Sequence, residues 1–286
     1  MPRTILASLT GLSSDRTVLE AAVAAARIEG GHITCLHTRI DVVEAAALMA
    51  TASPRRDTDV SALLRRISEQ ENEHSRHARL VFDDICKRCT LAVRDTPGDA
   101  AGISASWKEN QSFLNETLHE ARYHDLTVMG RNEELAADRI VSVLMQSGRP
   151  LLLAPEKPVE IIGRRVAIAW KATAEAARAV TAASHILSHA GSVAILSVAE
   201  ESDDSERISA EHLVRNLTWQ GIKADVRMCK SPQRSTSQAL LDMAYDCDAD
   251  LLVMGAYGHS RIKEFIFGGV TSDLLKASAL PLFMVR

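Results

Sequence analysis

Short apolar runs alternate with longer segments of helical propensity along the chain, most regularly in its second half. The apolar runs there lie near residues 165–170, 192–198, 223–228, 250–255 and 281–285. The segments between them that favour helix lie near residues 173–190, 205–220, 234–247 and 271–279. β-Prone runs separated by helices of this length predict right-handed parallel crossovers. The pattern therefore predicts an α/β protein with a doubly wound parallel sheet.

One sequence motif occurs twice. His124-Asp-Leu-Thr-Val-Met-Gly130 and Ala249-Asp-Leu-Leu-Val-Met-Gly255 share Asp-Leu-x-Val-Met-Gly at a displacement of 125 residues. Each copy is followed by a helical stretch and then by an apolar run that begins with proline, Pro150–Ala154 in one case and Pro281–Val285 in the other. A repeat of this length that ends the same way twice indicates a duplicated domain.

The duplication predicts two domains, residues 1–156 and residues 163–286. The segment between them, Glu156–Gly163, is short and stiffened by proline. The first half also carries an additional Ala-rich segment near residues 42–52. A loop at Ser53–Asp57 follows it and leads into a long helix that extends toward Lys87.

Glycines mark the place where a ligand is expected. In an open parallel sheet, ligands bind beyond the carboxyl ends of the strands. After the fourth strand of the second half, Gly255 and Gly258 lie three residues apart, and the pair Gly268-Gly269 follows after nine more residues. Glycines let backbone N–H groups approach an anion, and the pair lies where the dipole of the last helix favours phosphate. The same glycines also suit ordinary turns and caps, and their spacing alone does not decide between the two.

This spacing resembles the G-x2-G-x9-G-[S/T] signature of the universal stress protein family, and the resemblance extends through the second half. The whole chain resembles a tandem universal stress protein, whose repeats each adopt a five-stranded α/β fold and can bind ATP. The resemblance implies that the glycines surround the phosphates, that Thr271 offers a hydroxyl, and that His259 and Arg261 lie in the same loop. The implied nucleotide-binding set is Trp170, Lys171, Val198, Met254, Gly255, Gly258, His259, Arg261, Gly268, Gly269, Val270 and Thr271.

The resemblance also predicts how the two domains are built and joined. Each should be a five-stranded parallel sheet with strand order 3-2-1-4-5. We expect the domains to form a pseudo-dimer through their last strands, because Leu151–Ala154 and Leu282–Val285 would otherwise be apolar sheet edges. A homodimer of the whole chain is left open.

The second half departs from the family pattern at two positions. The serine or threonine after the third glycine of the signature is Gly269 here, which keeps an N–H group but lacks a hydroxyl. The acidic residue that helps nucleotide-binding members recognise adenosine falls at Lys171, and an ammonium cannot accept a hydrogen bond. Lys171 either reaches a phosphate or is a solvated lysine at a loop tip.

The first half departs further. Gly130 precedes Pro150 by 20 residues, whereas Gly255 precedes Pro281 by 26. The shorter loop lacks the second glycine and the glycine pair, and it carries Glu133 and Glu134, which would repel a triphosphate. We therefore expect the first half to hold no nucleotide.

Composition and charge exclude several classes of partner. Lys+Arg 33 against Asp+Glu 37 gives a net charge of −4, and aromatic residues make up 4% of the chain. Such a chain has neither the basic field nor the stacking surface that nucleic acid requires. Apolar runs such as Leu151–Ala154 are far shorter than the roughly 20 residues of a membrane-spanning helix. The N-terminus lacks the pattern of a signal peptide. The expected location is the cytoplasm, with neither nucleic acid nor a membrane as partner.

Five cysteines in a chain of this length do not form a disulfide scaffold. Cys86 and Cys89 have metal-ligand spacing, and His74 and His77 precede them on a predicted helix. On one continuous helix His77 and Cys86 point to opposite sides, so a zinc site would require that helix to break. We expect free thiols and no metal.

Taken together, these features favour a nucleotide-responsive stress protein. ATP, or else ADP or AMP, would bind in the second half and bias the conformation or partner surface of the tandem pair. The alternative is a nucleotide-free scaffold that acts through protein–protein contacts. An enzyme with weak ATP hydrolysis ranks third, because no positioned general base can be named and the chain has no P-loop.

Overall fold

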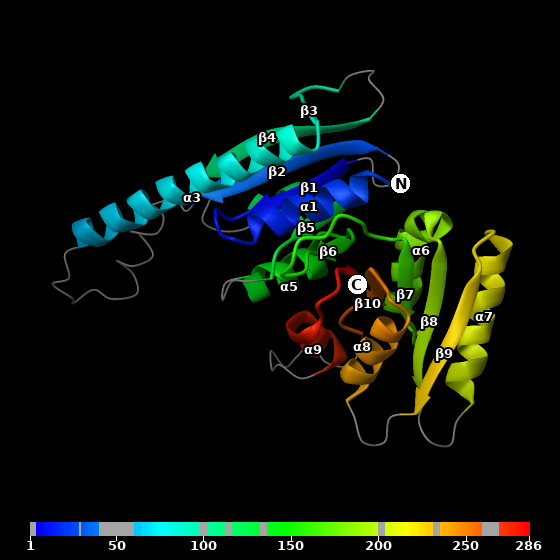
Figure 1. Cartoon of the computed structure of the whole chain (residues 1–286). Coiled ribbons are helices and arrows are strands. Elements are labelled where there is room, and N and C mark those ends of the chain that lie inside the picture. Colours follow the sequence, from blue (N-terminus) through cyan, green and yellow to red (C-terminus); the bar gives the residue numbers. More distant parts are fainter. Residues whose placement is uncertain are drawn as a thin grey trace.

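In the described part of the chain, eleven strands form one sheet with helices on both faces (Figure 1). The computed structural model describes residues 4–28, 30–39, 60–97, 102–111, 116–131, 136–199, 204–230, 235–258 and 269–286. The Ala-rich segment near 42–52, the loop at Ser53–Asp57, and Glu133 and Glu134 lie outside these residues.

The described residues of the first half contain six strands. They are β1 (Thr4–Leu9), β2 (Gly31–Arg39), β3 (Ala92–Val93), β4 (Ile103–Gln111), β5 (Leu126–Met129) and β6 (Leu151–Leu153). Its helices are α1 (Asp15–Ala26), α3 (Val60–Arg88), α4 (Glu116–Ala121) and α5 (Ala136–Gln146). The two-residue strand β3 extends the sheet beyond the five predicted strands, because it pairs with the outer edge of β4.

The second half follows the predicted pattern closely. Its strands are β7 (Arg165–Ala169), β8 (Ser192–Ala199), β9 (Ala224–Lys230), β10 (Leu251–Gly255) and β11 (Leu282–Val285). Its helices are α6 (Ala174–His189), α7 (Ser205–Trp219), α8 (Thr236–Asp246) and α9 (Val270–Ala277). Every one of these elements lies within two residues of its predicted bounds.

The two halves join through their last strands, as predicted. The strand order is β3-β4-β2-β1-β5-β6-β11-β10-β7-β8-β9, so each half has the order 3-2-1-4-5, with β3 added at one edge. Strands β6 and β11 pair antiparallel, with Phe283 opposite Leu152. In Figure 1 the strands of the first half run across the view and those of the second run nearly vertically, because twist accumulates across a wide sheet. The pairing removes two apolar edges from water.

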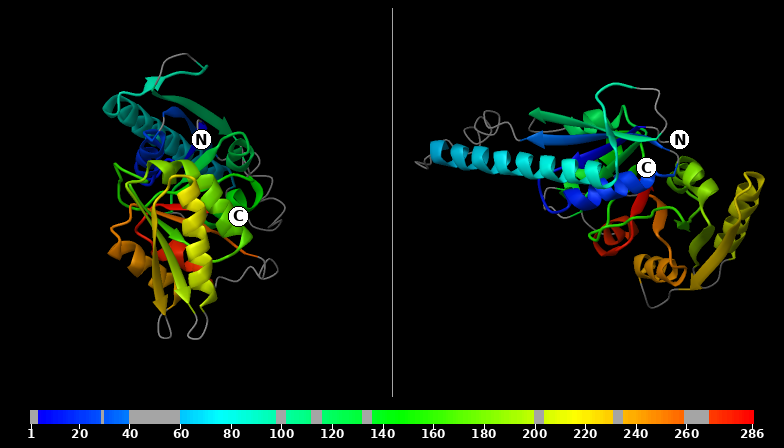
Figure 2. Two further views of the ribbon diagram at one scale, coloured as in Figure 1. Left: turned by 90° about the vertical axis from the view of Figure 1, so that its right-hand side faces the viewer. Right: turned by 45° about the horizontal axis from the view of Figure 1, so that its top comes forward.

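Side chains of successive strand residues point to opposite faces and form two cores. Along β10, Leu251 and Val253 belong to one core, whereas Leu252 and Met254 belong to the other. The first core lies under α1, α3, α6 and α7, and the second lies under α4, α5, α8 and α9. The views in Figure 2 show the helices on both sides of the sheet.

The aspartate of the repeated motif accepts backbone hydrogen bonds in both halves. The backbone N–H of Thr4 donates to Asp125 Oδ2 at 3.1 Å. In the second half, Asp250 accepts the N–H groups of Gly163 at 2.7 Å and Arg165 at 2.9 Å. Each aspartate therefore fastens the start of the first strand of its half to the start of the fourth, which defines equivalent positions in the two halves.

An arginine of the first half reaches into the second. Arg131, directly after β5, donates Nη2–H to the carbonyl of Leu280 at 2.9 Å and also donates to the carbonyl of Ser278. Burial lowers the pKa of Arg131 to about 10, so the side chain stays charged at neutral pH. These two bonds fasten the segment after α9 to the neighbouring half.

All five cysteines lie in the described residues, and none is joined in a disulfide. Helix α3 continues unbroken past His77 and Cys86, so it lacks the break that a zinc site would need. Burial raises the pKa of Cys86 to about 11, which keeps that thiol protonated. We expect five thiols to titrate in the unreduced, denatured protein. A lower number, or about one equivalent of zinc by elemental analysis, would contradict this prediction.

Within the described residues, no helix combines the length and the apolar character that crossing a membrane requires.

Candidate functional site

A cavity of about 660 Å³ opens at the carboxyl ends of β7, β8 and β10, beside the N-termini of α6, α8 and α9. We refer to it as the glycine cleft. It is lined by Ala169, Trp170, Lys171, Thr173, Glu175, Ala176, Val198, Ala199, Glu206, Thr236, Leu240, Met254, Gly255, Tyr257, Gly258, Val270 and Thr271. The fold therefore places a hollow at the switch point where open α/β sheets bind ligands.

The structure brings together eight of the twelve residues predicted for this site. Trp170, Lys171, Val198, Met254, Gly255, Gly258, Val270 and Thr271 all line the glycine cleft. Gly269 caps the start of α9 and is not among the lining residues. His259, Arg261 and Gly268 lie outside the described residues.

The two glycines that line the cleft, Gly255 and Gly258, have different physical roles. A Cβ at Gly255 would lie 2.4 Å from the backbone nitrogen of Ala176 and 2.6 Å from the carbonyl carbon of Glu175. Gly255 therefore allows the first turn of α6 to pack directly on β10. A Cβ at Gly258 would meet only Glu175 Oε2, at 3.5 Å. The space above Gly258 is open to the cleft, so its backbone is accessible to a ligand.

Backbone conformation explains one departure from the family pattern. Gly269 has φ 155° and ψ 160°, a region that is essentially restricted to glycine. A serine or threonine would be strained there, although nothing lies within 4 Å of its Cβ position. Tyr257, between the two cleft glycines, has φ 52°, which is uncommon for a residue with a side chain. Unusual backbone of this kind concentrates at ligand sites.

The glycine cleft is also lined by two carboxylates, Glu175 and Glu206, which the sequence analysis did not identify. The side chain of Glu175 is 6% exposed and pairs with Arg178, with Glu175 Oε1 and Arg178 Nη2 3.1 Å apart. Glu206 enters from the first turn of α7. Their position on amphipathic helices gave no signal, because such residues usually face solvent. The cleft thus has carboxylates near Lys171, although none stands at position 171 itself.

The equivalent region of the first half is covered. Gly11 follows β1, and a Cβ there would lie 2.4 Å from Cβ and 2.5 Å from Cα of His74 on α3. The long helix therefore packs directly on the loop whose counterpart in the second half borders the cleft. Beside it, Asp15 accepts the N–H of Gly11 at 2.8 Å, and burial raises the pKa of this carboxyl. This packing reduces the space beside the carboxyl end of β1.

The family model for the universal stress protein family matches residues 163–286, the half that contains the glycine cleft. The second half of the chain therefore carries a universal stress protein domain. A curated universal stress protein of Synechocystis is 23% identical over 223 residues, which cover 73% of this chain and 75% of that protein.

Solved structures support the same fold for both halves. A universal stress protein from Archaeoglobus fulgidus DSM 4304 is similar over 100% of this chain and 99% of its own, with a TM-score of 0.71 and 18% identity. A universal stress protein from Pseudomonas aeruginosa UCBPP-PA14 is similar over 99% of this chain and 93% of its own, with a TM-score of 0.56 and 14% identity. The fold of this chain is therefore similar to these two solved structures along its whole length.

Proposed function

We propose that this chain is a universal stress protein that binds one adenine nucleotide in the glycine cleft, and that the bound nucleotide biases the surface offered to a protein partner. The observation that carries the proposal is the cleft itself, where two loop glycines and the N-terminus of α9 converge at the switch point of the sheet. The preferred nucleotide is ATP, with ADP and AMP as competitors. No residue is assigned a catalytic role.

The phosphate end of the nucleotide would lie over Gly258 and the first turn of α9. Gly258 presents accessible backbone, and Val270 and Thr271 line the cleft at the positive end of the helix dipole. The hydroxyl of Thr271 can donate a further hydrogen bond to a phosphate oxygen. Within the described residues, these groups would recognise an anion through backbone N–H groups and one hydroxyl.

The nucleoside end would lie among the apolar side chains of the cleft. Val198, Leu240 and Met254 line it, and together they suit a purine ring. Glu206 can accept a hydrogen bond from a ribose hydroxyl or from the adenine amino group.

The charge of Glu175 limits the affinity. Its Oε2 atom is the nearest atom to the Cβ position of Gly258, so a carboxylate faces the proposed phosphate position. The ion pair with Arg178 offsets part of this repulsion. A nucleotide that carries Mg²⁺ would be repelled less than the free anion. We therefore expect Mg²⁺ to strengthen binding.

The same carboxylate favours a second candidate function, the nucleotide-free scaffold. In that case the ion pair of Glu175 with Arg178 stabilises the start of α6, and the glycines serve only as close-packing and cap positions. The protein would then act through its surface alone.

Isothermal titration with ATP, ADP and AMP, each with and without Mg²⁺, tests the proposal on the full chain. We expect saturation near one equivalent per chain. Loss of the acceptor at position 171 removes a charge-assisted hydrogen bond, which weakens binding by roughly one to two decades. Saturation at two equivalents would contradict the asymmetry between the halves. No heat from any of the three nucleotides at millimolar concentration would favour the scaffold.

A further inference from the structure

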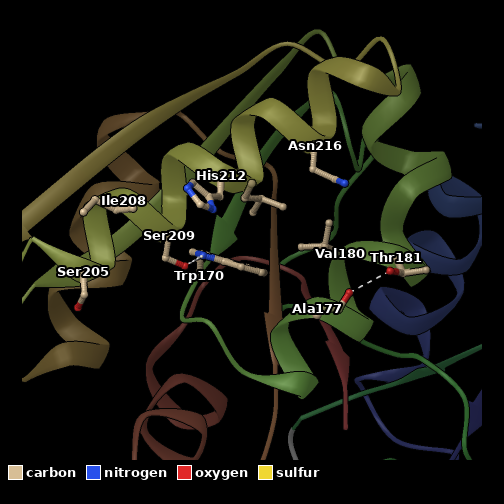
Figure 3. Close-up of a pocket in the computed structure, with 10 residues that line it drawn as sticks. Trp170, Ala177, Val180, Thr181, Ser205, Ile208, Ser209, His212 and Asn216 are labelled. Atoms are coloured by element: carbon tan, nitrogen blue, oxygen red, sulfur yellow. Dashed lines mark hydrogen bonds between the residues drawn. The ribbon is translucent and has the colours of Figure 1, made fainter.

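A second cavity, of about 620 Å³, lies between helices α6 and α7 and shares Trp170 with the glycine cleft (Figure 3). We refer to it as the α6–α7 groove. It is lined by Trp170, Ala177, Val180, Thr181, Ser205, Ile208, Ser209, His212, Leu213 and Asn216. The side chains of Val180 and Leu213 are buried at its floor, and the indole Nε1–H of Trp170 donates to Ser209 Oγ at 2.9 Å.

The first half of the chain closes the same space with ion pairs. Gly130 packs on Ser14 as Gly255 packs on Glu175, so Arg16 and Glu20 of α1 correspond to Ala177 and Thr181 of α6. Arg16 Nη2 lies 2.8 Å from Asp84 Oδ2 on α3. Glu20 Oε1 lies 3.2 Å from Arg88 Nη1 on the same helix. Alanine and threonine cannot form such pairs, so α6 lacks the charges that hold α1 against α3.

The first half also packs aromatic rings between its sheet and α3. Thr4 pairs with His32 and Arg165 pairs with Ser192, so Cys35 of β2 corresponds to Ile195 of β8. Cys35 pairs with Trp107, whereas Ile195 pairs with Val226.

Trp107 packs against the fully buried ring of Phe82, with ring centroids 5.5 Å apart. In the second half, Val226 stands at the position of Trp107. The aromatic side chain that lines the α6–α7 groove is Trp170.

We propose that the α6–α7 groove binds an uncharged aromatic small molecule. None of its ten lining residues is a carboxylate, a lysine or an arginine, so the lining selects against ions. The indole of Trp170 offers a surface for stacking. Figure 3 shows His212 and Asn216 directed into the space between the helices, where they can hydrogen-bond a hydroxyl or amine on the ring. This site is distinct from the glycine cleft, and the proposal does not depend on nucleotide binding.

Titration of the full chain with N-phenyl-1-naphthylamine tests this proposal, with energy transfer from tryptophan to the probe as the readout. We expect saturation near one equivalent, with a dissociation constant in the range of about 10–100 μM. Ala177→Phe places a ring of the protein in the groove and should weaken binding at least about tenfold. Ser188→Phe adds the same ring to an exposed position of α6 outside the groove, and it should change the affinity less than about twofold.

A fold check, a second groove variant and two further controls complete the test. Because Ala177 is exposed, the phenylalanine variant should fold, and circular dichroism checks this. Thr181→Phe, on the same helix, repeats the test from a second position. Unsaturable binding, or unchanged affinity in both groove variants, would overturn the proposal. Loss of probe binding in Gly258→Val would place the probe in the glycine cleft instead. Probe-reversible dimers in sedimentation velocity would assign the groove to a second copy of the chain.

Discussion

Gly258→Val is expected to weaken ATP binding by at least about a hundredfold while leaving the fold intact. The nearest atom to a Cβ at this position is Glu175 Oε2 at 3.5 Å, an ordinary van der Waals distance. The unliganded chain therefore accommodates the new side chain. Its methyl groups would occupy the space through which a phosphate must reach the backbone, and they would prevent the close approach on which the proposed site depends.

Isothermal titration measures this loss, and a thermal melt of the same sample shows whether the fold is retained. The matched control is Thr218→Val, which introduces the same side chain at an exposed position of α7 outside the cleft. We expect its ATP affinity to equal that of the wild type. If Gly258→Val binds ATP within threefold of the wild type while it remains folded, the phosphates do not lie over Gly258.

Gly255→Ala is expected to destabilise the protein by about 3 kcal/mol or more. The added methyl group would lie 2.4 Å from the backbone nitrogen of Ala176 and 2.6 Å from the carbonyl carbon of Glu175. Both atoms belong to the first turn of α6, which the side chain of Thr173 caps by accepting the Ala176 N–H. Relief of the clash requires the whole helix end to move away from the sheet, which disrupts packing in the core.

Gly130→Ala makes the matched comparison in the first half. The added methyl group would meet Ser14 Cβ at 2.9 Å and Ser14 Oγ at 3.1 Å, contacts with a side chain rather than with backbone. The expected loss is smaller, about 1 kcal/mol. Urea unfolding followed by circular dichroism should place the midpoint of Gly255→Ala below that of Gly130→Ala, and the reverse order would refute the packing argument. Because Gly130→Ala itself strains the first half, Thr218→Val is the better control for nucleotide binding.

Local pattern was enough to define the elements of the second half. Its strands and helices end near glycines, prolines and capping residues, which set the backbone conformation of the residues next to them. Thr173 and Ser235 each cap a helix through a side-chain oxygen, accepting from Ala176 N and Gln238 N respectively. The apolar character of Leu151–Ala154 and Leu282–Val285 also sufficed to predict that the halves join through their last strands, because an exposed apolar edge has few alternatives to pairing. The antiparallel direction of that pairing came from the structure.

By itself, the sequence determined the duplicated α/β fold and the position of the glycine loop, and its family resemblance predicted the strand order. Only the tertiary structure decided which polar groups face that loop. Glu175 enters the cleft because Gly255 lets α6 approach β10, and this approach joins residues 80 positions apart. The covering of Gly11 by His74 and the open space between α6 and α7 likewise depend on how distant helices pack. Periodicity specifies which side of a helix is buried, but packing between distant segments decides which neighbour it meets.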